Sequence, residues 1–157
     1  MPEASSEPTI VTLEPTEAAV LRETVAMDAL PEFFDRAYHA VADALERQGV
    51  GIAGPPVGVY HGMPSETVDV AAGFPTERAA ADSDGVTAVT LPGGRAAQVL
   101  HTGSYDGLAD AYRRLLRWLG DQGAAPGPVV WESYLTEPLP GGDQDGTKTL
   151  ITWPLAG

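Results

Sequence analysis

The sequence predicts an α+β domain made of two β-α-β-β modules, one in each half of the chain. Strand and helix periodicities follow one another in the order strand, helix, strand, strand in both halves. Short segments also recur in the same order in both halves. The 157 residues are 43% hydrophobic, which is enough for one globular domain with its own core.

The first half is expected to begin with a disordered N-terminal segment that is followed by two strands. Residues 1–8 are polar and are expected to be disordered. Runs rich in β-forming residues follow at 10–13 and at 18–27, and Pro15 separates them. The single folded domain is therefore expected over residues 9–157.

A helix is expected next, between Asp28 and Gly49. Asp28 is a suitable N-cap, and Pro31 fits the first helical turn. Gly49 is a suitable residue to end the helix, because glycine adopts the left-handed conformation found there. Apolar side chains recur at helical spacing between these limits, at Phe34, Ala37, Tyr38, Val41 and Leu45.

Two more strands complete the first module, which spans about residues 9–75. They are expected at 57–61 and 67–74, with a turn around Gly62 and Pro64 between them. The stretch 76–85 is polar and rich in alanine, so it is expected to be a linker.

The second module is expected over about residues 86–157, and it begins with two strands and a helix. The strands are expected at 86–91 and 95–102. Ser104 is a suitable N-cap for the helix, and Gly120 and Gly123 are expected to close it. Its apolar stripe consists of Tyr105, Leu108, Tyr112, Leu115 and Leu119.

The last two strands are expected at 129–135 and 147–152, around a turn rich in glycine, aspartate and proline. Pro154 is expected to stop the second of them.

The repeat rests on short segments that match in order between the halves. A helix follows the first match in each half. The matching pairs are 18–21 with 96–100, 48–50 with 122–124, 54–55 with 127–128, and 74–75 with 153–154. Each module would form a small sheet with one helix on one face. Two modules related by a pseudo-two-fold axis would create a central groove, which is a common place for a ligand.

The net charge of −13 argues against some partners. It comes from 9 basic and 22 acidic residues, whereas a nucleic-acid surface needs clustered basic residues. An acidic field attracts cations, although a need for solubility alone would also account for it. We therefore expect no nucleic-acid partner.

The sequence contains no signal for a membrane span, for secretion or for a metal or cofactor site. No apolar run approaches the roughly 20 residues that span a membrane, and the N-terminus lacks a signal peptide. The chain contains no cysteine, and His39, His61 and His101 lack metal-ligand spacing. We expect a cytoplasmic protein without membrane contact, metal or cofactor.

Glu132 is the candidate functional residue in the strand at 129–135. Alternation along a strand places it on one face with Val130 and Tyr134, and places Trp131 on the other face. Burial of a lone carboxylate costs several kcal/mol and raises its pKa. A bound cation or a substrate proton would offset this cost. Alternation alone leaves open a glutamate in water at a sheet edge, or one paired with an arginine such as Arg22 or Arg95.

Aromatic residues accompany Glu132 in the predicted strands. Tyr60 and Phe74 lie in the first half, and Trp131, Tyr134 and Trp153 lie in the second. Aromatic faces attract organic cations by about 0.5–2 kcal/mol each. Ordinary core packing is the alternative role for each of them.

The chain resembles the GyrI-like small-molecule-binding domain, also called the bacterial transcription activator effector-binding domain. The matching stretches are 54–62, 101–105, 127–135 and 153–155, and the resemblance covers about residues 9–155. It implies a tandem pair of modules of the SHS2 type. It also implies an inter-module groove that binds lipophilic, often cationic compounds, with Glu132 as its acidic residue and Tyr60 in its wall. The chain resembles the stand-alone members.

The candidate ligand-binding residues are Glu132, Tyr60, Tyr134, Trp131, Phe74, Trp153 and His101. The function expected first is multidrug binding, in which a hydrophobic or cationic aromatic compound is sensed or sequestered. The resemblance implies two alternatives. One is a hydrolase that opens cyclopropane rings of DNA-alkylating natural products with Glu132 as its catalytic acid or base, and the other is an inhibitor of gyrase or of an unknown protein partner.

Overall fold

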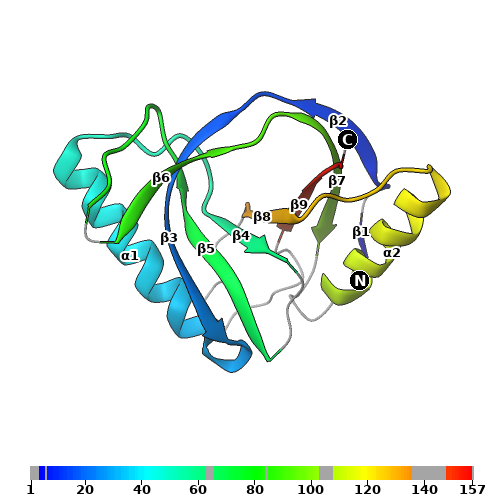
Figure 1. The fold of residues 1–157 in the computed structure, drawn as a ribbon, viewed down its shortest axis with the longest axis horizontal. Helices are drawn as coiled ribbons and strands as arrows, with labels where there is room; N and C mark the ends of the chain where they lie inside the picture. Colours follow the sequence, from blue (N-terminus) through cyan, green and yellow to red (C-terminus); the bar gives the residue numbers. More distant parts are fainter. Residues whose placement is uncertain are drawn as a thin grey trace. The chain divides into compact units, whose positions relative to one another are not determined.

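The computed structural model describes residues 4–5, 7–62, 66–83, 85–102, 108–135 and 148–156. Its contacts divide the chain into two units, each with antiparallel strands and one α-helix (Figure 1). The α1 unit is Glu14–Gly93 and contains helix α1 (Leu30–Gln48). The α2 unit is Met1–Leu13 with Gly94–Gly157 and contains helix α2 (Leu108–Asp121). The predicted α+β class is confirmed.

The α1 unit contains four strands in an antiparallel sheet. They are β3 (Thr16–Ala26), β4 (Val57–His61), β5 (Thr67–Pro75) and β6 (Val86–Leu91). β5 pairs with β4 on one side and with β3 on the other, and β3 also pairs with β6. All four strands lie within a few residues of the predicted ranges.

Helix α1 starts differently from the prediction. A 3₁₀ turn, Met27–Ala29, leads directly from β3 into the helix, so Asp28 lies inside that turn. The N-cap is Ala29, and no side chain caps the helix. Pro31 occupies the first turn, and Gly49 ends the helix at φ 67° as predicted.

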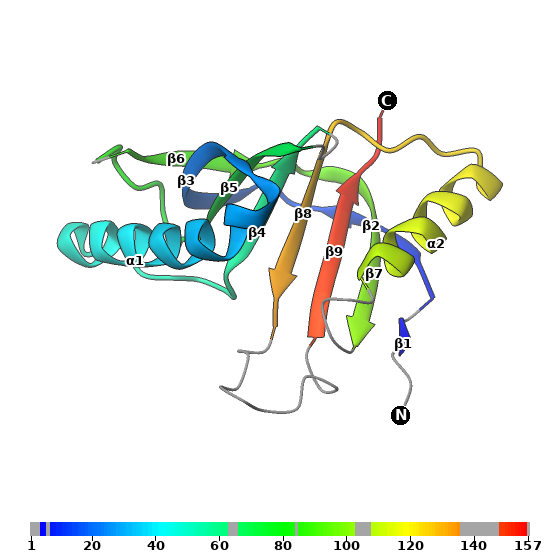
Figure 2. The same cartoon turned by 90° about the horizontal axis from the view of Figure 1, so that it is seen from below.

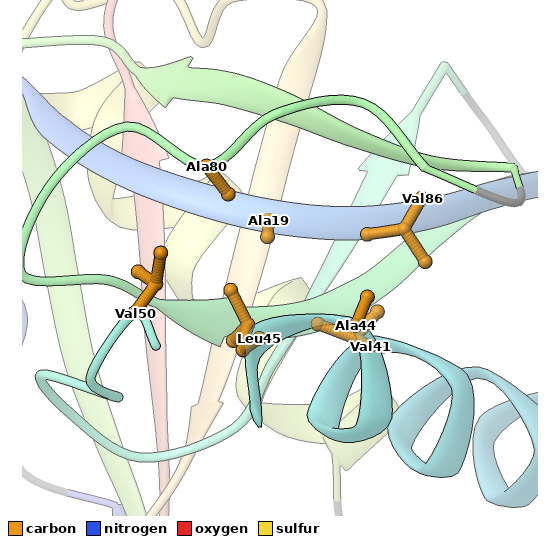
Figure 3. Packing of buried hydrophobic residues seen from close by; sticks show 7 residues of the cluster. All are labelled: Ala19, Val41, Ala44, Leu45, Val50, Ala80 and Val86. Atoms are coloured by element: carbon orange, nitrogen blue, oxygen red, sulfur yellow. The ribbon is translucent and has the colours of Figure 1, made fainter. Parts of the chain in front are cut away.

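The core of the α1 unit lies between α1 and its sheet (Figure 3). The cluster consists of Ala19, Val41, Ala44, Leu45, Val50, Ala80 and Val86. Ala80 comes from the stretch 76–85 that was expected to be a linker, yet it is only 8% exposed. The Gln48 side chain makes two hydrogen bonds with the backbone of Ala81. Its Oε1 accepts from the N–H at 2.8 Å, and its Nε2 donates to the carbonyl oxygen at 2.9 Å. This stretch therefore packs as part of the unit.

The α2 unit repeats the order strand, helix, strand, strand. Its strands are β1 (Ala4–Ser5), β2 (Thr9–Leu13), β7 (Gly94–Thr102), β8 (Val129–Tyr134) and β9 (Lys148–Pro154). β9 lies between β8 and β7, with α2 packed against β7 (Figure 2). β5 likewise lies between β4 and β3 in the α1 unit, so both units share one pairing pattern.

Three strands lie outside the modules expected from the sequence. β6, expected to open the second module, pairs with β3 in the α1 unit. β2, expected in the first module, pairs with β7 in the α2 unit. Within the N-terminal segment that was expected to be disordered, Ala4–Ser5 instead forms β1 and also pairs with β7. Periodicity identifies strands but not their partners, which hydrogen bonding over long sequence separations decides.

Two boundaries in the α2 unit also differ from the prediction. Gly120 lies inside α2, and Gly123, at φ 68°, follows the end of the helix. β9 extends to Pro154 and so includes Trp153. Ser104 and Tyr105 lie outside the described residues, as does the turn between β8 and β9. No helix in the described part of the chain has both the length and the apolar character needed to cross a bilayer.

Candidate ligand site around Glu132

Glu132 occupies the middle of β8, on the face of the sheet that α2 covers. It lies directly opposite Ile151 of β9, which lies opposite Val99 of β7. Paired residues of antiparallel strands present their side chains on the same face. The Glu132 side chain therefore shares its face with Ile151 and Val99, and the residue is only 5% exposed.

Two tyrosine hydroxyls donate hydrogen bonds to the Glu132 carboxylate, one to each oxygen. The hydroxyl of Tyr112, from α2, lies 2.5 Å from Oε2. The hydroxyl of Tyr134, two residues further along β8, lies 2.8 Å from Oε1. The helix reaches the strand because one side of α2 packs into the core, through Ala111, Leu115 and Leu119.

Trp153 supports Tyr112 from β9. The two rings meet edge to face, with centroids 5.9 Å apart and an interplanar angle of 77°. The indole Nε1 donates a hydrogen bond to the backbone oxygen of Gly127 at 2.9 Å. The tryptophan side chain is therefore positioned both by this hydrogen bond and by its contact with the Tyr112 ring. This arrangement fixes the position from which Tyr112 reaches Glu132.

A row of polar residues lies beside the carboxylate on the same face. Tyr134 of β8 lies opposite Thr149 of β9, and Thr149 lies opposite His101 of β7. Thr149 and His101 are buried, at 0% and 2% exposed. Glu132, Tyr134, Thr149 and His101 therefore form one polar cluster between the sheet and α2.

Burial raises the pKa of the Glu132 carboxyl above its ordinary value of 4.5. The hydroxyls of Tyr112 and Tyr134 oppose this rise, and so does the electrostatic attraction of His101. The net direction of the pKa is upward because loss of water around the carboxylate outweighs the three favourable interactions. The carboxyl group therefore keeps its proton to a higher pH than an exposed glutamate does.

The alternative positions considered for Glu132 do not occur. The residue is buried and is not at a water-exposed edge. Arg22 forms a bidentate pair with Asp69, at 2.8 and 2.7 Å, and Arg95 is exposed. Within the described ranges, the hydroxyls of Tyr112 and Tyr134 hydrogen-bond to the carboxylate, and neither arginine pairs with it.

The other candidate residues fall into three places. Tyr134, Trp153 and His101 share the face of Glu132, as their strand registers require. Trp131 lies on the opposite face, opposite Thr152. Tyr60 and Phe74 belong to the α1 unit, where Tyr60 lies opposite Val70 and the Phe74 ring lies 5.5 Å from the Tyr38 ring. The groove expected between the modules stays a prediction.

Sequence reasoning placed Tyr112 only in an apolar helical stripe and gave Thr149 no role. The repeat contained a signal for Tyr112. Tyr38 precedes Gln48 by the same spacing that separates Tyr112 from Gln122, so a tyrosine recurs at one helix position. Nothing in the sequence pattern distinguished Thr149 from other strand threonines, because its significance comes from the residues beside it in the sheet.

The described residues include no cluster of three or more histidine, aspartate or glutamate side chains suited to hold a metal ion.

Comparisons with known proteins identify a family and a fold. The family described as GyrI-like small molecule binding domain matches residues 6–156. A search of curated proteins gave no match. Among solved structures, the C-terminal domain of EcmrR is similar at TM-score 0.83 and 18% identity, covering 96% of this chain and 97% of that one.

Two further solved structures have the same fold. SAV2435 bound to tetraphenylphosphonium is similar at TM-score 0.66 and 14% identity, covering 97% of this chain and 95% of that one. A hydrolase from Listeria innocua is similar at TM-score 0.66 and 12% identity, covering 96% of this chain and 92% of that one.

Proposed function

The chain belongs to the GyrI-like small molecule binding domain family, and on this premise we propose that it binds lipophilic, aromatic, positively charged compounds. In the proposed complex, Glu132 neutralises the positive charge of the guest. Tyr134, Trp153 and His101 would line the same place, and Tyr60, Phe74 and Trp131 would contribute further aromatic surface. The protein would act in the cytoplasm as a sensor, buffer or sequestering protein.

The observation that carries this proposal is the state of the Glu132 carboxylate. It is buried, and two neutral hydroxyls hydrogen-bond to it. A buried carboxylate is costly even when hydroxyls hydrogen-bond to it, and the cost falls when a cation arrives. A guest that brings a positive charge and an apolar surface would therefore gain both electrostatic and hydrophobic free energy.

A structural neighbour supports the choice of guest. SAV2435 has been seen with tetraphenylphosphonium, which is an aromatic cation that cannot lose its charge. The same compound is a suitable probe for this chain, since it has no hydrogen-bond donor that could confuse charge recognition with hydrogen bonding.

The test is calorimetric titration of tetraphenylphosphonium into the wild-type protein and into Glu132→Gln. We expect the substitution to weaken binding at least tenfold, which corresponds to about 1.4 kcal/mol. Glu46→Gln is the matched control, because it removes the same charge from an exposed position on α1. Equal weakening in both variants would mean that overall acidity, and not this carboxylate, attracts the cation.

Hydrolysis of a strained ring is the second candidate. The raised pKa of Glu132 favours it, because a carboxyl group with a pKa nearer neutrality exchanges protons with a substrate more readily. Incubation with a cyclopropane-containing DNA-alkylating compound, followed by mass spectrometry, would detect a product heavier by one water molecule. Product formed by the wild type but not by Glu132→Gln would support the enzyme, and none would leave binding alone.

A further inference from the structure

We propose that Thr149 is a second polar anchor of the Glu132 site, so that the preferred guest carries a hydroxyl or carbonyl oxygen in addition to its positive charge. The inference rests on the proposed function and narrows the class of guest.

The Thr149 hydroxyl is buried without a hydrogen bond. The residue is 0% exposed, and its Oγ1 has no hydrogen-bond partner among the described residues. A buried polar group left unpaired costs about 1–3 kcal/mol. Buried polar groups in native proteins are almost always paired, so an exception calls for a missing partner.

The strand register places this hydroxyl next to the carboxylate. Thr149 lies between Tyr134 and His101 in one cross-strand row. Glu132 lies in the adjacent row, opposite Ile151, which puts it diagonal to Thr149. Diagonal neighbours in an antiparallel pair are about 7–8 Å apart. A guest of the size of one substituted aromatic ring spans that separation.

Two comparisons within the chain indicate that the fold does not need this hydroxyl. The strand position that Thr149 occupies in β9 is occupied in β5 by Val70, which lies opposite Tyr60 and is fully buried. Valine has the shape of threonine without the hydroxyl. Thr152, buried on the other face of β9, has a partner in the Gln98 side chain at 3.2 Å. Of these two buried threonines of β9, the one with the unpaired hydroxyl is therefore the one on the face that carries Glu132.

A threonine hydroxyl can donate one hydrogen bond and can also accept hydrogen bonds, so it can pair with a hydroxyl or a carbonyl oxygen of a guest. The Glu132 carboxylate would meanwhile pair with the positive charge of the guest. The two groups together would select lipophilic cations with an oxygen on an aromatic ring over cations that are wholly hydrocarbon around the charge.

The test uses Thr149→Val and two probes that differ in one hydroxyl. The probes are tetraphenylphosphonium and (4-hydroxyphenyl)triphenylphosphonium, titrated calorimetrically at a pH where the phenol is protonated. We expect the wild type to bind the hydroxylated probe about five- to tenfold more tightly, as one hydrogen bond of about 1–1.5 kcal/mol predicts. We expect Thr149→Val to lose that preference and to bind the two probes with equal affinity.

Thr152→Val is the matched control, because it removes a buried hydroxyl from the opposite face of the same strand. It should keep the preference for the hydroxylated probe. Thermal unfolding provides a readout that needs no ligand, and Thr149→Val should be at least as stable as the wild type since the hydroxyl it removes is unpaired.

Two outcomes would overturn the inference. The wild type could bind both probes equally, or Thr149→Val could keep the preference. If Thr149→Val kept the preference and were also less stable than the wild type, a water molecule or another part of the chain would be satisfying the hydroxyl. Failure of the wild type to bind either probe would instead count against the proposed function, as would equal binding of tetraphenylphosphonium by Glu132→Gln.

Discussion

Gly58 holds in the α1 unit the strand position that Glu132 holds in the α2 unit. Gly58 lies opposite Ala72 of β5, and Glu132 lies opposite Ile151 of β9. A tyrosine follows each of them two residues later, Tyr60 in β4 and Tyr134 in β8. The two units therefore share a register, but only one of them carries an acid at this position.

The two helix tyrosines, Tyr112 and Tyr38, also differ in the group to which the hydroxyl donates. Tyr112 donates its hydroxyl to Glu132, whereas Tyr38, at the equivalent position of α1, donates to the backbone oxygen of Val57 at 3.1 Å. Each tyrosine ring also contacts an aromatic residue of the third strand, Trp153 or Phe74. The contrast offers an internal control for experiments on the Glu132 site.

Replacement of Tyr112 by phenylalanine should raise the pKa of Glu132 further and weaken cation binding. The hydroxyl stabilises the charged carboxylate, and a hydrogen bond to a charged group contributes about 1.5–3 kcal/mol. We expect at least a tenfold loss of tetraphenylphosphonium affinity near the pKa. Carbon-13 NMR of the Glu132 carboxyl measures its titration directly.

Tyr38→Phe is the control for that substitution. It removes one hydroxyl from the equivalent position and should cost about 1 kcal/mol of stability without moving the Glu132 titration. An unchanged Glu132 pKa in Tyr112→Phe would mean that the hydroxyl does not interact with the charged form.

The affinity for a permanent cation should rise with pH. Protons and the cation compete for Glu132, and burial raises the pKa of that carboxyl above 4.5. Below the raised pKa the carboxyl is neutral, so affinity should fall by up to about tenfold for each pH unit. Calorimetry from pH 4 to pH 8 would reveal the slope, and Glu132→Gln should give a flat profile over the same range.

Glu132 should also make the wild type lose stability as the pH rises. The folded state has the higher pKa, so it binds the proton more tightly than the unfolded state does. Stability from this group is therefore fully present below pH 4.5 and is lost as the pH rises through the folded-state pKa. Each unit of pKa difference is worth about 1.4 kcal/mol.

Urea unfolding of the wild type and Glu132→Gln across this pH range would isolate that contribution. Asp69 and Glu23 have lowered pKa values from their arginine partners and give the opposite slope, but they are present in both proteins. The free energy of unfolding of Glu132→Gln minus that of the wild type should therefore grow with pH. A constant difference would contradict the raised pKa.

Gly73 should not tolerate a side chain. A Cβ at this position would lie 1.9 Å from the backbone oxygen of Ala19 on the paired strand β3. The backbone cannot move aside without breaking the sheet, so Gly73→Ala should lose about 3 kcal/mol or more, or fail to fold. Gly120→Ala is the contrast, because its Cβ meets nothing within 4 Å and alanine favours the helix by about 1 kcal/mol. Thermal unfolding of the two variants should shift in opposite directions.

The sequence was sufficient to find most elements and the acid. The Gly49 helix end, the β4 and β6 ranges and the alternation that puts Glu132 with Tyr134 all follow from local patterns, and the structure has them. Local patterns depend on backbone preferences and on side-chain periodicity, which a single sequence contains.

Pairing and cross-element contacts were not predictable in the same way. β6 follows a stretch that resembles a linker, yet it pairs with β3, and the sequence offers no measure of that preference. Tyr112 looked like a core residue because it sits in an apolar stripe, and only its distance from Glu132 reveals a second use for its hydroxyl. Asp28 failed as a cap because the 3₁₀ turn moved the helix start by one residue.

The pairing of β2 with β7 joins residues near the start of the chain to the half that contains Glu132. During synthesis, β2 can therefore pair with β7 only after β7 has also left the ribosome, when most of the chain has been made. Removal of residues 1–13 would delete both β1 and β2. One side of β7 would then be left with unpaired backbone N–H and C=O groups. Such an edge invites intermolecular association, so shortened versions should be judged by their oligomeric state before their binding is interpreted.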